Sequence, residues 1–495
     1  MPTGTSFNRF QNLLLEKVDA AVSNLEIRVE DPAWGIIQGF SNTKKVGRVS
    51  GAGAKSRNEA GYEARWVVQL QSGGRMTGAK FGETRATLMG PNDAHIMGYS
   101  ASGLGLDPMQ TPSRSNMELV SYLRRLKGQV VESEESLEAQ LLATPIEQIA
   151  MGHLEDITKL VRHNTVALAW GAGDGVMATL NQAAGQAITD AAVAWVTVDA
   201  GSPFRFKAGQ RYVAAATTTV KFDTPRAGSL NSPGVLRCVG VNPHTLKVGF
   251  QAEIGEGTVT LVDNDSILLE GMWDFNTAAT STTDNTPSMA PNGFENLLID
   301  DGNFPDTSVD VGDVPELQAY IDGDYDDPDL PTPELIDKVL DLQTQGGSIE
   351  DRGPYVMLAE ASIWTLYSEL ERRAMAMTPV TGVFTAAGGV SGPVYSYAGK
   401  SVVRLASPMC RRSTIYGLDR TSFRRYFPND LMVQWRTQQG GVPGMPSIFR
   451  PISVGTQLSE ITAADFYYWM QLAVTRPQGN FILRGIDSTQ TASAA

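Results

Sequence analysis

The last third of the chain constrains the fold most, because it places strands and a helix in one fixed order. The apolar strand Tyr355-Val-Met-Leu-Ala leads directly into the amphipathic helix Glu360–Arg373. Further strand patterns follow at 393–397, 400–405, 413–419, 465–474 and 480–486. None of these elements carries a nucleophile, a metal cluster or a phosphate-binding loop.

Composition indicates a large globular chain with an uneven charge distribution. With 495 residues and 42% hydrophobic content, the chain can bury several cores, which predicts two to four domains or subdomains. The net charge of −14 argues against a chain that wraps nucleic acid, since such binding depends on neutralising phosphates. Residues 41–127 carry 13 basic and 6 acidic side chains, a local +7, so the remainder sums to −21. Attraction between such regions on neighbouring copies would favour assembly and weaken with salt.

Cysteine usage and hydropathy favour a cytoplasmic protein. Cys238 and Cys410 lie far apart and no CxxC occurs, so neither a disulfide framework nor a structural zinc site is expected. The N-terminus shows no basic leader before an apolar core, so we expect no signal peptide. No apolar run approaches the ~20 residues of a membrane-spanning helix.

The N-terminal region predicts an extended arm and a long loop. Residues 1–46 form the arm, with one short helix around Leu13–Val22. Residues 47–82 contain eight glycines interleaved with six basic side chains. The run Tyr62–Gln71 is typical of a strand, and Gly73-Gly74 of a hairpin turn. A two-stranded loop cannot bury a core of its own, so it needs a neighbour to lie on.

A long helix is predicted over 144–170. It begins at Thr144-Pro145 and ends at Gly171-Ala-Gly-Asp-Gly. Its apolar stripe at helical spacing includes Ile146, Ile149, Ile157 and Leu160. We expect this stripe to face a sheet of the terminal strands, including Phe481 and Leu483.

Beyond the helix, the pattern changes to short strands. Period-two patterns over 195–275, separated by turn residues, predict a small inserted β-barrel. The Thr/Ser/Pro-rich segment 276–292 is interpreted as a linker. Residues 300–337 carry 13 acidic and no basic side chains, and Thr332-Pro333-Glu334 opens a helix that runs through Leu342.

Motifs that would carry nucleotide or hydrolase chemistry do not fit their required contexts. Gly171-Ala-Gly-Asp-Gly follows a helix, whereas a dinucleotide loop follows a strand and opens a helix, so a helix stop is favoured. No GxxxxGK[ST] occurs. The run Gly98-Tyr-Ser-Ala-Ser-Gly lacks the GxSxG spacing of a nucleophile elbow.

Acid–base, metal and thiol chemistry have few candidates. The only histidines are His95, His153, His163 and His244, and structural roles are the expected ones. Arg411-Arg412 could lower the pKa of the Cys410 thiol, but no Cys–His pairing can be inferred.

Two further segments were weighed as ligand sites. Asp322-Gly-Asp-Tyr-Asp-Asp resembles the start of a calcium loop, but Asp327 replaces its glycine and Pro333 its glutamate, which favours a solvated acidic loop. The basic segment 47–82 has few aromatic side chains for stacking on bases, so a partner-docking arm is favoured over nucleic-acid binding. We therefore predict no catalytic, cofactor-binding or metal-binding residues and no cofactor.

In this order, the elements resemble the Hong Kong 97-type capsid fold of tailed-bacteriophage major capsid proteins over nearly the whole chain. The strongest local matches are Ile415-Tyr-Gly-Leu-Asp419 and Thr475-Arg-Pro-Gln-Gly-Asn480. The resemblance implies an α+β fold with an N-terminal arm (1–46), an extended loop (47–110), a peripheral domain with a spine helix (111–194), an inserted barrel (195–275), a linker (276–292), an axial domain (293–440) and a return to the peripheral domain (441–495).

The resemblance also implies a function. The chain would be a non-enzymatic head protein that assembles into pentamers and hexamers of an icosahedral shell around double-stranded DNA. Its partners would be copies of itself, with scaffolding, portal and decoration proteins, and no membrane. It would assemble in the host bacterial cytoplasm and reside in the virion. Lys55 and Lys80 lie where some relatives cross-link, but no activating carboxylate or partner asparagine can be identified.

Two alternatives remain open. An encapsulin encloses an enzyme with the same fold, but encapsulins are much shorter and lack a large barrel insertion. The alternative from another class is a hydrolase or sugar-binding protein with a β-barrel accessory domain, although no paired carboxylates at a recognisable spacing support it.

Overall fold

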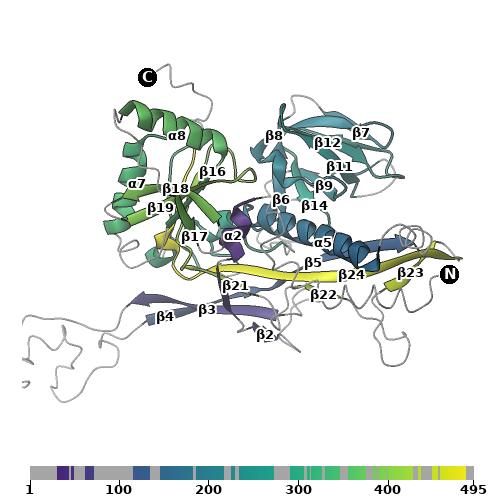
Figure 1. Ribbon diagram of the computed structural model, residues 1–495, viewed down its shortest axis with the longest axis horizontal. Coiled ribbons are helices and arrows are strands. Elements are labelled where there is room, and N and C mark those ends of the chain that lie inside the picture. Colours follow the sequence, from purple (N-terminus) through teal and green to yellow (C-terminus); the bar gives the residue numbers. More distant parts are fainter. Residues whose placement is uncertain are drawn as a thin grey trace, which may run out of the picture.

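The structure is a computed structural model with a mixed α+β fold, as predicted. It describes residues 31–38, 40–43, 46–48, 62–71, 115–133, 145–181, 185–216, 224–228, 233–272, 290–305, 309–312, 314–325, 329, 331–345, 355–374, 383–386, 390–397, 400–426, 433–435, 449–454 and 457–486. The predicted helix around Leu13–Val22 and the turn at Gly73-Gly74 lie outside these residues. Two sheets, a barrel and a long helix make up the body (Figure 1).

One sheet is built from the strands predicted in the last third. Its order is β15 (Tyr320–Asp322), β25 (Phe481–Leu483), β20 (Ile415–Leu418), β16 (Tyr355–Ala359), β19 (Lys400–Ala406), β18 (Val390–Tyr397) and β17 (Val383–Ala386). The central strand β16 pairs parallel to β19 and antiparallel to β20. It leads into α8 (Ala361–Ala374), which confirms the predicted strand-to-helix run.

Two helices cover this seven-stranded sheet. In α7 (Pro333–Gln345), the Thr332 hydroxyl accepts a hydrogen bond from the Leu335 N–H at 3.2 Å, which caps the helix start as predicted. In α8, the Trp364 indole N–H donates to the Leu405 carbonyl at 2.8 Å. Both helices bury apolar side chains against the sheet, including Ile336, Val339, Ile363 and Tyr367.

The other large sheet contains the longest strand of the described chain. It comprises β1 (Ser41–Thr43), β21 (Phe423–Tyr426), β24 (Gln457–Val474), β22 (Val433–Trp435), β23 (Phe449–Val454) and β5 (Arg124–Ser133). The strand β24 has 18 residues and pairs with β5 in ten register positions. At about 3.3 Å per residue, β24 spans roughly 60 Å, which makes this sheet long.

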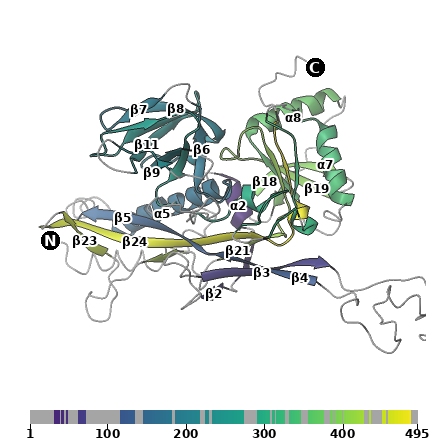
Figure 2. The same cartoon turned by 180° about the vertical axis from the view of Figure 1, so that it is seen from behind.

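Different elements cover the two faces of this six-stranded sheet. The helix α5 (Ile146–Ala169) lies along one face, and the views in Figures 1 and 2 agree on this. A three-stranded sheet of β2 (Val46–Arg48), β3 (Tyr62–Gln71) and β4 (Ser115–Tyr122) lies on the opposite side. The rings of Trp66 and Tyr426 are 6.2 Å apart, so β3 packs against β21. The predicted strand Tyr62–Gln71 is therefore confirmed. It is the middle strand of a three-stranded sheet rather than one half of a two-stranded hairpin.

The helix α5 confirms the prediction of one long amphipathic helix, and its apolar stripe is buried. Ile149, Leu154, Ile157 and Val161 are each at most 7% exposed. The stripe shares a core with the terminal strand β24, as expected, but two of the expected partners were wrong. Phe481 and Leu483 pack with α7 and α8, whereas the intervening Ile482 belongs to the core that contains α5. Successive side chains of a strand point to opposite faces, so β25 divides its residues between two cores.

The inserted region closes into a barrel. The strands β9 (Arg211–Ala216), β11 (Val235–Asn242), β12 (Lys247–Ala252), β8 (Ala194–Gly201), β6 (Val176–Leu180) and β14 (Ser266–Leu269) pair in a cycle, because β14 also pairs with β9. β10 (Thr224–Pro225) extends β9, and β7 (Gln186–Thr189) pairs with β13 (Thr258–Leu261). The barrel thus begins before residue 195, its predicted start, because the barrel strand β6 directly follows the glycine turn that ends α5.

Short elements fill the centre between barrel and sheets. They are α2 (Ala33–Gln38), α6 (Phe294–Leu297) and the 3₁₀ turns Pro203–Arg205, Pro315–Leu317 and Pro477–Gly479. The Trp170 ring lies 5.2 Å from Phe294 and 5.0 Å from Tyr416, which joins α5 to α6 and β20. Residues 290–292, the end of the predicted linker, are buried in this centre.

We predict that Ile157→Ala lowers the melting temperature sharply. Ile157 is 3% exposed, and truncating a fully buried isoleucine costs about 2–5 kcal/mol. Lys159→Ala is the matched control on the same helix, because Lys159 makes an i,i+4 ion pair with Glu155 at the surface and surface changes usually stay within about 0.5 kcal/mol. Equal shifts for the two variants in thermal denaturation would contradict burial of the stripe.

Candidate functional site

The residues weighed for catalysis do not come together. The His163 ring Nε2 lies 3.0 Å from the Arg205 carbonyl oxygen, which is a structural contact. His153 lines a surface groove, and His244 lies in an exposed turn. His95 lies outside the described residues. Within the described part of the chain, no three His, Cys, Asp or Glu side chains are placed to hold a metal ion.

Cys238 and Cys410 are both buried and not disulfide-bonded. Burial raises the pKa of Cys410 well above its usual value, and the nearby Arg205 guanidinium lowers it less. The interpretation that Arg411-Arg412 could lower this pKa was therefore wrong. The sequence shows neighbouring charges but not that the thiol is withdrawn from water, and desolvation of the thiolate outweighs their effect. Cys410 is thus not set up as a nucleophile.

The acidic loop near Asp322 forms a turn. The Tyr320 hydroxyl donates to Asp322 Oδ2 at 3.0 Å, and the Gly323 N–H donates to Oδ1 at 2.9 Å. Burial, together with this carboxylate, raises the pKa of Tyr320 to about 12. Asp322 is therefore engaged by its own neighbours.

The two segments that carried the strongest resemblance meet in the structure. The chain passes from the seven-stranded to the six-stranded sheet between β20 and β21, and returns between β24 and β25. These two connections lie side by side. The Thr475 N–H donates to the Ser422 carbonyl at 2.8 Å, and Asn480 lies between them with no exposed surface. We call this pair of connections, residues 419–422 and 475–480, the crossover joint.

Asn480 satisfies polar groups from both connections of the crossover joint. Its Oδ1 accepts a hydrogen bond from the Asp419 N–H at 2.8 Å. Its Nδ2 lies within donating distance of Ser422 Oγ at 3.2 Å and of the carbonyls of Arg476 and Pro477 at 3.0 and 3.1 Å. One amide side chain therefore holds the two sheets in register where the chain crosses between them.

A second junction forms around the loop 407–411, between β19 and β20. The Ser407 hydroxyl donates to Asp31 Oδ2 at 2.6 Å, which ties this loop to the start of α2. From the barrel side, the Ser202 hydroxyl donates to the Pro408 carbonyl at 2.6 Å, and the Arg205 guanidinium to the Met409 carbonyl at 2.8 Å. We call residues 407–411 the hub loop, because it joins the barrel, α2 and the seven-stranded sheet.

Buried charges surround the hub loop. Burial lowers the pKa of Arg205 and raises that of Asp31. Glu295 accepts a hydrogen bond from the Tyr416 hydroxyl at 2.8 Å and forms an ion pair with Arg411 at 3.3 Å. Breaking one partner of such a buried set is strongly destabilising. The arrangement holds three parts of the fold together and offers no open face to a substrate.

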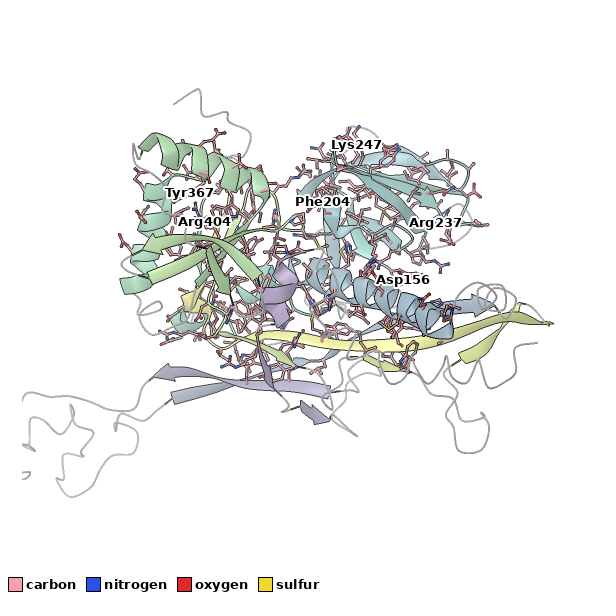
Figure 3. The ribbon with its side chains drawn as sticks, viewed as in Figure 1. Asp156, Phe204, Arg237, Lys247, Tyr367 and Arg404 are labelled. Atoms are coloured by element: carbon pink, nitrogen blue, oxygen red, sulfur yellow. The ribbon has the colours of Figure 1, made fainter. Side chains whose placement is uncertain are left out.

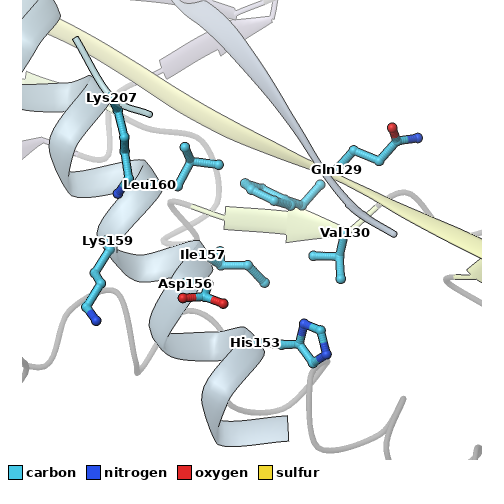
Figure 4. A pocket seen from close by; sticks show the side chains of 9 residues that line it. Gln129, Val130, His153, Asp156, Ile157, Lys159, Leu160 and Lys207 are labelled. Carbon is cyan, nitrogen blue, oxygen red and sulfur yellow. The ribbon is translucent and has the colours of Figure 1, made fainter. Parts of the chain in front are cut away.

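A groove of about 430 Å³ lies between α5, β5 and β24 (Figure 4). Its apolar floor is formed by Val130, Ile157, Leu160 and Phe466. Polar side chains at its rim, which include His153, Asp156, Lys159 and Lys207, come from α5 and from the barrel.

Comparisons with known proteins find similarity at the level of structure. The chain matches no protein-family model and no curated protein. Over 93% of its length and 93% of the other chain, it is similar to a cyanophage A-1(L) capsid chain, at 9% identity and a TM-score of 0.42. It is also similar to the capsid of a native GTA particle, at 10% identity, 93% and 92% coverage and a TM-score of 0.37.

The similarity to an encapsulin is partial. The chain spans 56% of the length of the holo-SrpI encapsulin from Synechococcus elongatus PCC 7942, over 36% of its own length, at 16% identity and a TM-score of 0.24. All these TM-scores are below 0.5, so none of the likenesses by itself assigns a function. In addition, none of the described helices combines the length and apolarity needed to cross a membrane.

We predict that Asn480→Leu destabilises the protein strongly. The substitution keeps the number of heavy atoms but removes the acceptor of the buried Asp419 N–H, and leaving such a group without its partner costs about 1–3 kcal/mol. Asn303→Leu, at an exposed asparagine, is the control. Thermal denaturation should show a large loss for the first variant only. A melting temperature for Asn480→Leu equal to that of the control would refute the role of the crossover joint.

We predict that Asp31→Asn makes the stability of the protein less dependent on pH. Burial raises the pKa of Asp31 above its ordinary value of 3.8, so the ionised carboxylate lowers stability progressively as pH rises above that value. The amide carries no charge, and its oxygen can still accept from the Ala33 N–H, although its nitrogen cannot accept from the Met409 N–H as Asp31 Oδ2 does. The melting temperature of the variant relative to that of the wild type should therefore be higher at pH 7 than at pH 4. A relative melting temperature that falls as pH rises would contradict the sign, and Asp301→Asn, at an exposed carboxylate, is the control.

Proposed function

We propose that this chain is the major head protein of a tailed bacteriophage, a non-enzymatic subunit of a closed shell. The observation that carries the proposal is the shape of the subunit. A six-stranded sheet about 60 Å long is joined through the crossover joint to a compact seven-stranded α/β unit, and a separate three-stranded sheet lies along one side (Figure 1). A long plate with a compact end suits lateral contacts with several copies of itself.

The three-stranded sheet supports a role in contacts between subunits. Its described core is small: Ala64, Trp66, Leu119 and Ser121 are buried. It belongs to the basic region 41–127, with its local charge of +7. We propose that the loop between β3 and β4 extends this sheet onto a neighbouring subunit, as the resemblance to the extended loop implies.

Charge supports a partner surface for the basic region 41–127. Exposed aspartates lie in the acidic region 300–337, among them Asp300, Asp301, Asp310, Asp324 and Asp329. The basic region of one copy would be attracted to an acidic surface of the next, and such exposed attraction is screened at high salt. Assembly should therefore be favoured at low ionic strength.

The cargo and the partners follow from the same proposal. We propose a shell of pentamers and hexamers that encloses double-stranded DNA, with scaffolding, portal and decoration proteins as partners, assembled in the host cytoplasm. A net charge of −14 suits a wall that does not grip the duplex. The predicted arm, axial and peripheral divisions belong to this proposal. The strand β25 makes the division more complex, because it lies within the returning segment 441–495 but pairs in the seven-stranded sheet.

We predict that removing the loop between β3 and β4 abolishes shells without unfolding the subunit. Gln71 pairs with Ser115, so residues 72–114 can be replaced by Asn-Gly, which closes a two-residue hairpin and keeps Trp66 in place. The variant should keep the melting temperature of the isolated wild-type subunit. Light scattering and negative-stain microscopy should show closed particles for the wild type only.

The control is a variant in which residues 72–114 are replaced by a Gly/Ser segment of equal length. It should also remain folded and fail to assemble, because it keeps the length of the loop but lacks the side chains that would contact a neighbouring subunit. Closed shells of normal stability from the hairpin variant would refute the docking role of the loop. A wild-type protein that remains a 53.3 kDa monomer under all conditions would refute the shell itself.

A further inference from the structure

We propose that the outward face of β8, β11 and β12 on the barrel binds an acidic glycan, with Trp195 as its stacking platform. Trp195 is 43% exposed, although tryptophan has a large apolar surface that is usually buried. Nothing in the shell proposal requires an exposed indole at this position. A ligand that binds this face of the barrel would explain the exposed indole.

Two glycines make the surface beside Trp195 flat. Gly249 pairs with Trp195 on one side and with Gly240 on the other, so the three residues form one row across three strands. A Cβ on Gly249 would lie 3.2 Å from Cη2 and Cζ3 of the indole, which shows that the ring occupies the space over this glycine. Around Gly240, no atom lies within 4 Å of such a Cβ. The row therefore presents an aromatic ring beside open backbone.

A hydrogen-bonded pair of side chains, Arg237 and Gln251, borders this row on one side, and we call this pair the fork. The Arg237 guanidinium donates to Gln251 Oε1 at 2.8 Å, and Gln251 Nε2 donates to the Asp190 carbonyl at 2.6 Å. Arg237 and Gln251 are paired in register; Gln251 lies two residues from Gly249 along β12, and Arg237 lies three residues from Gly240 along β11, across a register shift. The fork is held in one orientation, and Arg237 keeps further N–H donors for a ligand. Such preorganisation reduces the entropy lost on binding.

A cation borders the row on the other side. Lys247 pairs with Thr197, two residues beyond the pairing of Gly249 with Trp195. Arg237 on β11 and Lys247 on β12 therefore lie on opposite sides of the row that contains Trp195, and the row of Lys247 is about 7 Å away along the strands. Between these two rows, the outward positions described on the three strands carry no carboxylate. The charge of the platform is thus complementary to a ligand with acid groups spaced around a flat ring.

These features favour a glycan over other ligand classes. A pyranose has a flat apolar face for the indole, hydroxyl groups for the fork and, in uronic acids, a carboxylate for the cations. Single-stranded nucleic acid is usually held by several aromatic side chains that stack successive bases, whereas this face has one. The apolar neighbours Val193 and Val239 add little area, and a stable protein interface buries about 800 Å² on each partner.

The strands that carry the platform belong to the part of the barrel away from the six-stranded sheet. In Figures 1 and 2, β8 and β12 lie on the side of the barrel opposite α5, and Figure 3 shows Lys247 at the far end of the barrel and Arg237 on its outer flank. If copies repeat over a shell, which rests on the proposed function, avidity could exceed the single-site affinity by about 10²–10⁴. Binding at one site does not require a shell.

The test measures binding of soluble oligosaccharides to the immobilised full-length protein, so that avidity does not contribute. The probes are an oligouronate from alginate, neutral maltohexaose and oligo(dT). We expect the oligouronate to bind best and its affinity to fall with salt. Trp195→Ala should weaken binding at least tenfold, and Trp195→Phe should retain part of it. Arg237→Gln and Lys247→Gln should each weaken binding severalfold and reduce its dependence on salt.

Two controls separate the platform from general effects. Ile254→Ala removes an aliphatic side chain that is 86% exposed on the neighbouring turn, and Lys159→Gln removes a cation on α5. Both should leave oligouronate binding unchanged, and all variants should keep the wild-type melting temperature. The proposal is overturned if oligo(dT) or maltohexaose binds as well as the oligouronate, if no probe binds, or if Trp195→Ala binds as the wild type does. A protein-docking patch would instead lose partner binding with Ile254→Ala as well.

Discussion

The arrangement of the whole subunit depends on the buried amide of Asn480 in the crossover joint. The two large sheets share no strand, and the chain passes between them at two neighbouring connections. Backbone groups at such connections lack ladder partners, and leaving them unpaired inside the protein is costly. Asn480 pairs with the Asp419 N–H and with two carbonyls of its own connection, so the crossing can be buried. This one side chain therefore links the two connections at which the chain crosses between the sheets.

The hub loop adds a second constraint of a different kind. Asp31, Arg205 and Glu295 bring charge into the centre of the molecule, where desolvation opposes it, as the raised pKa of Asp31 and the lowered pKa of Arg205 indicate. Buried ions contribute little net stability, but they strongly disfavour arrangements in which their partners are lost. The barrel, α2 and the seven-stranded sheet are therefore held in one relative position. A subunit that must present the same outline in every copy benefits from such selectivity more than from added stability.

Sequence reasoning succeeded where structure is local. The strand and helix at 355–374, the long helix that ends at Gly171 and the Thr332 cap were all predicted, because periodicity and capping act within a few residues. It failed where the answer depended on a distant partner. The pattern at Phe481–Leu483 indicated a strand but not that β15 and β20 would be its neighbours, so its side chains were assigned to the wrong core. The pKa of Cys410 was misjudged for the same reason, since burial cannot be deduced from adjacent arginines.

The features of the candidate functional surfaces can also be separated into those that depend on local sequence and those that depend on distant contacts. The sequence by itself determined the fold class, the strand and helix content, the uneven charge and the absence of familiar catalytic motifs, because each of these depends on composition or on neighbours along the chain. Only the tertiary structure decided that Asp419 and Asn480 meet, that Gly171 leads into a barrel strand, and that Trp195 lies beside Gly249 and between Arg237 and Lys247. These contacts depend on strand register, and register is selected by the packing of the whole sheet rather than by any single segment.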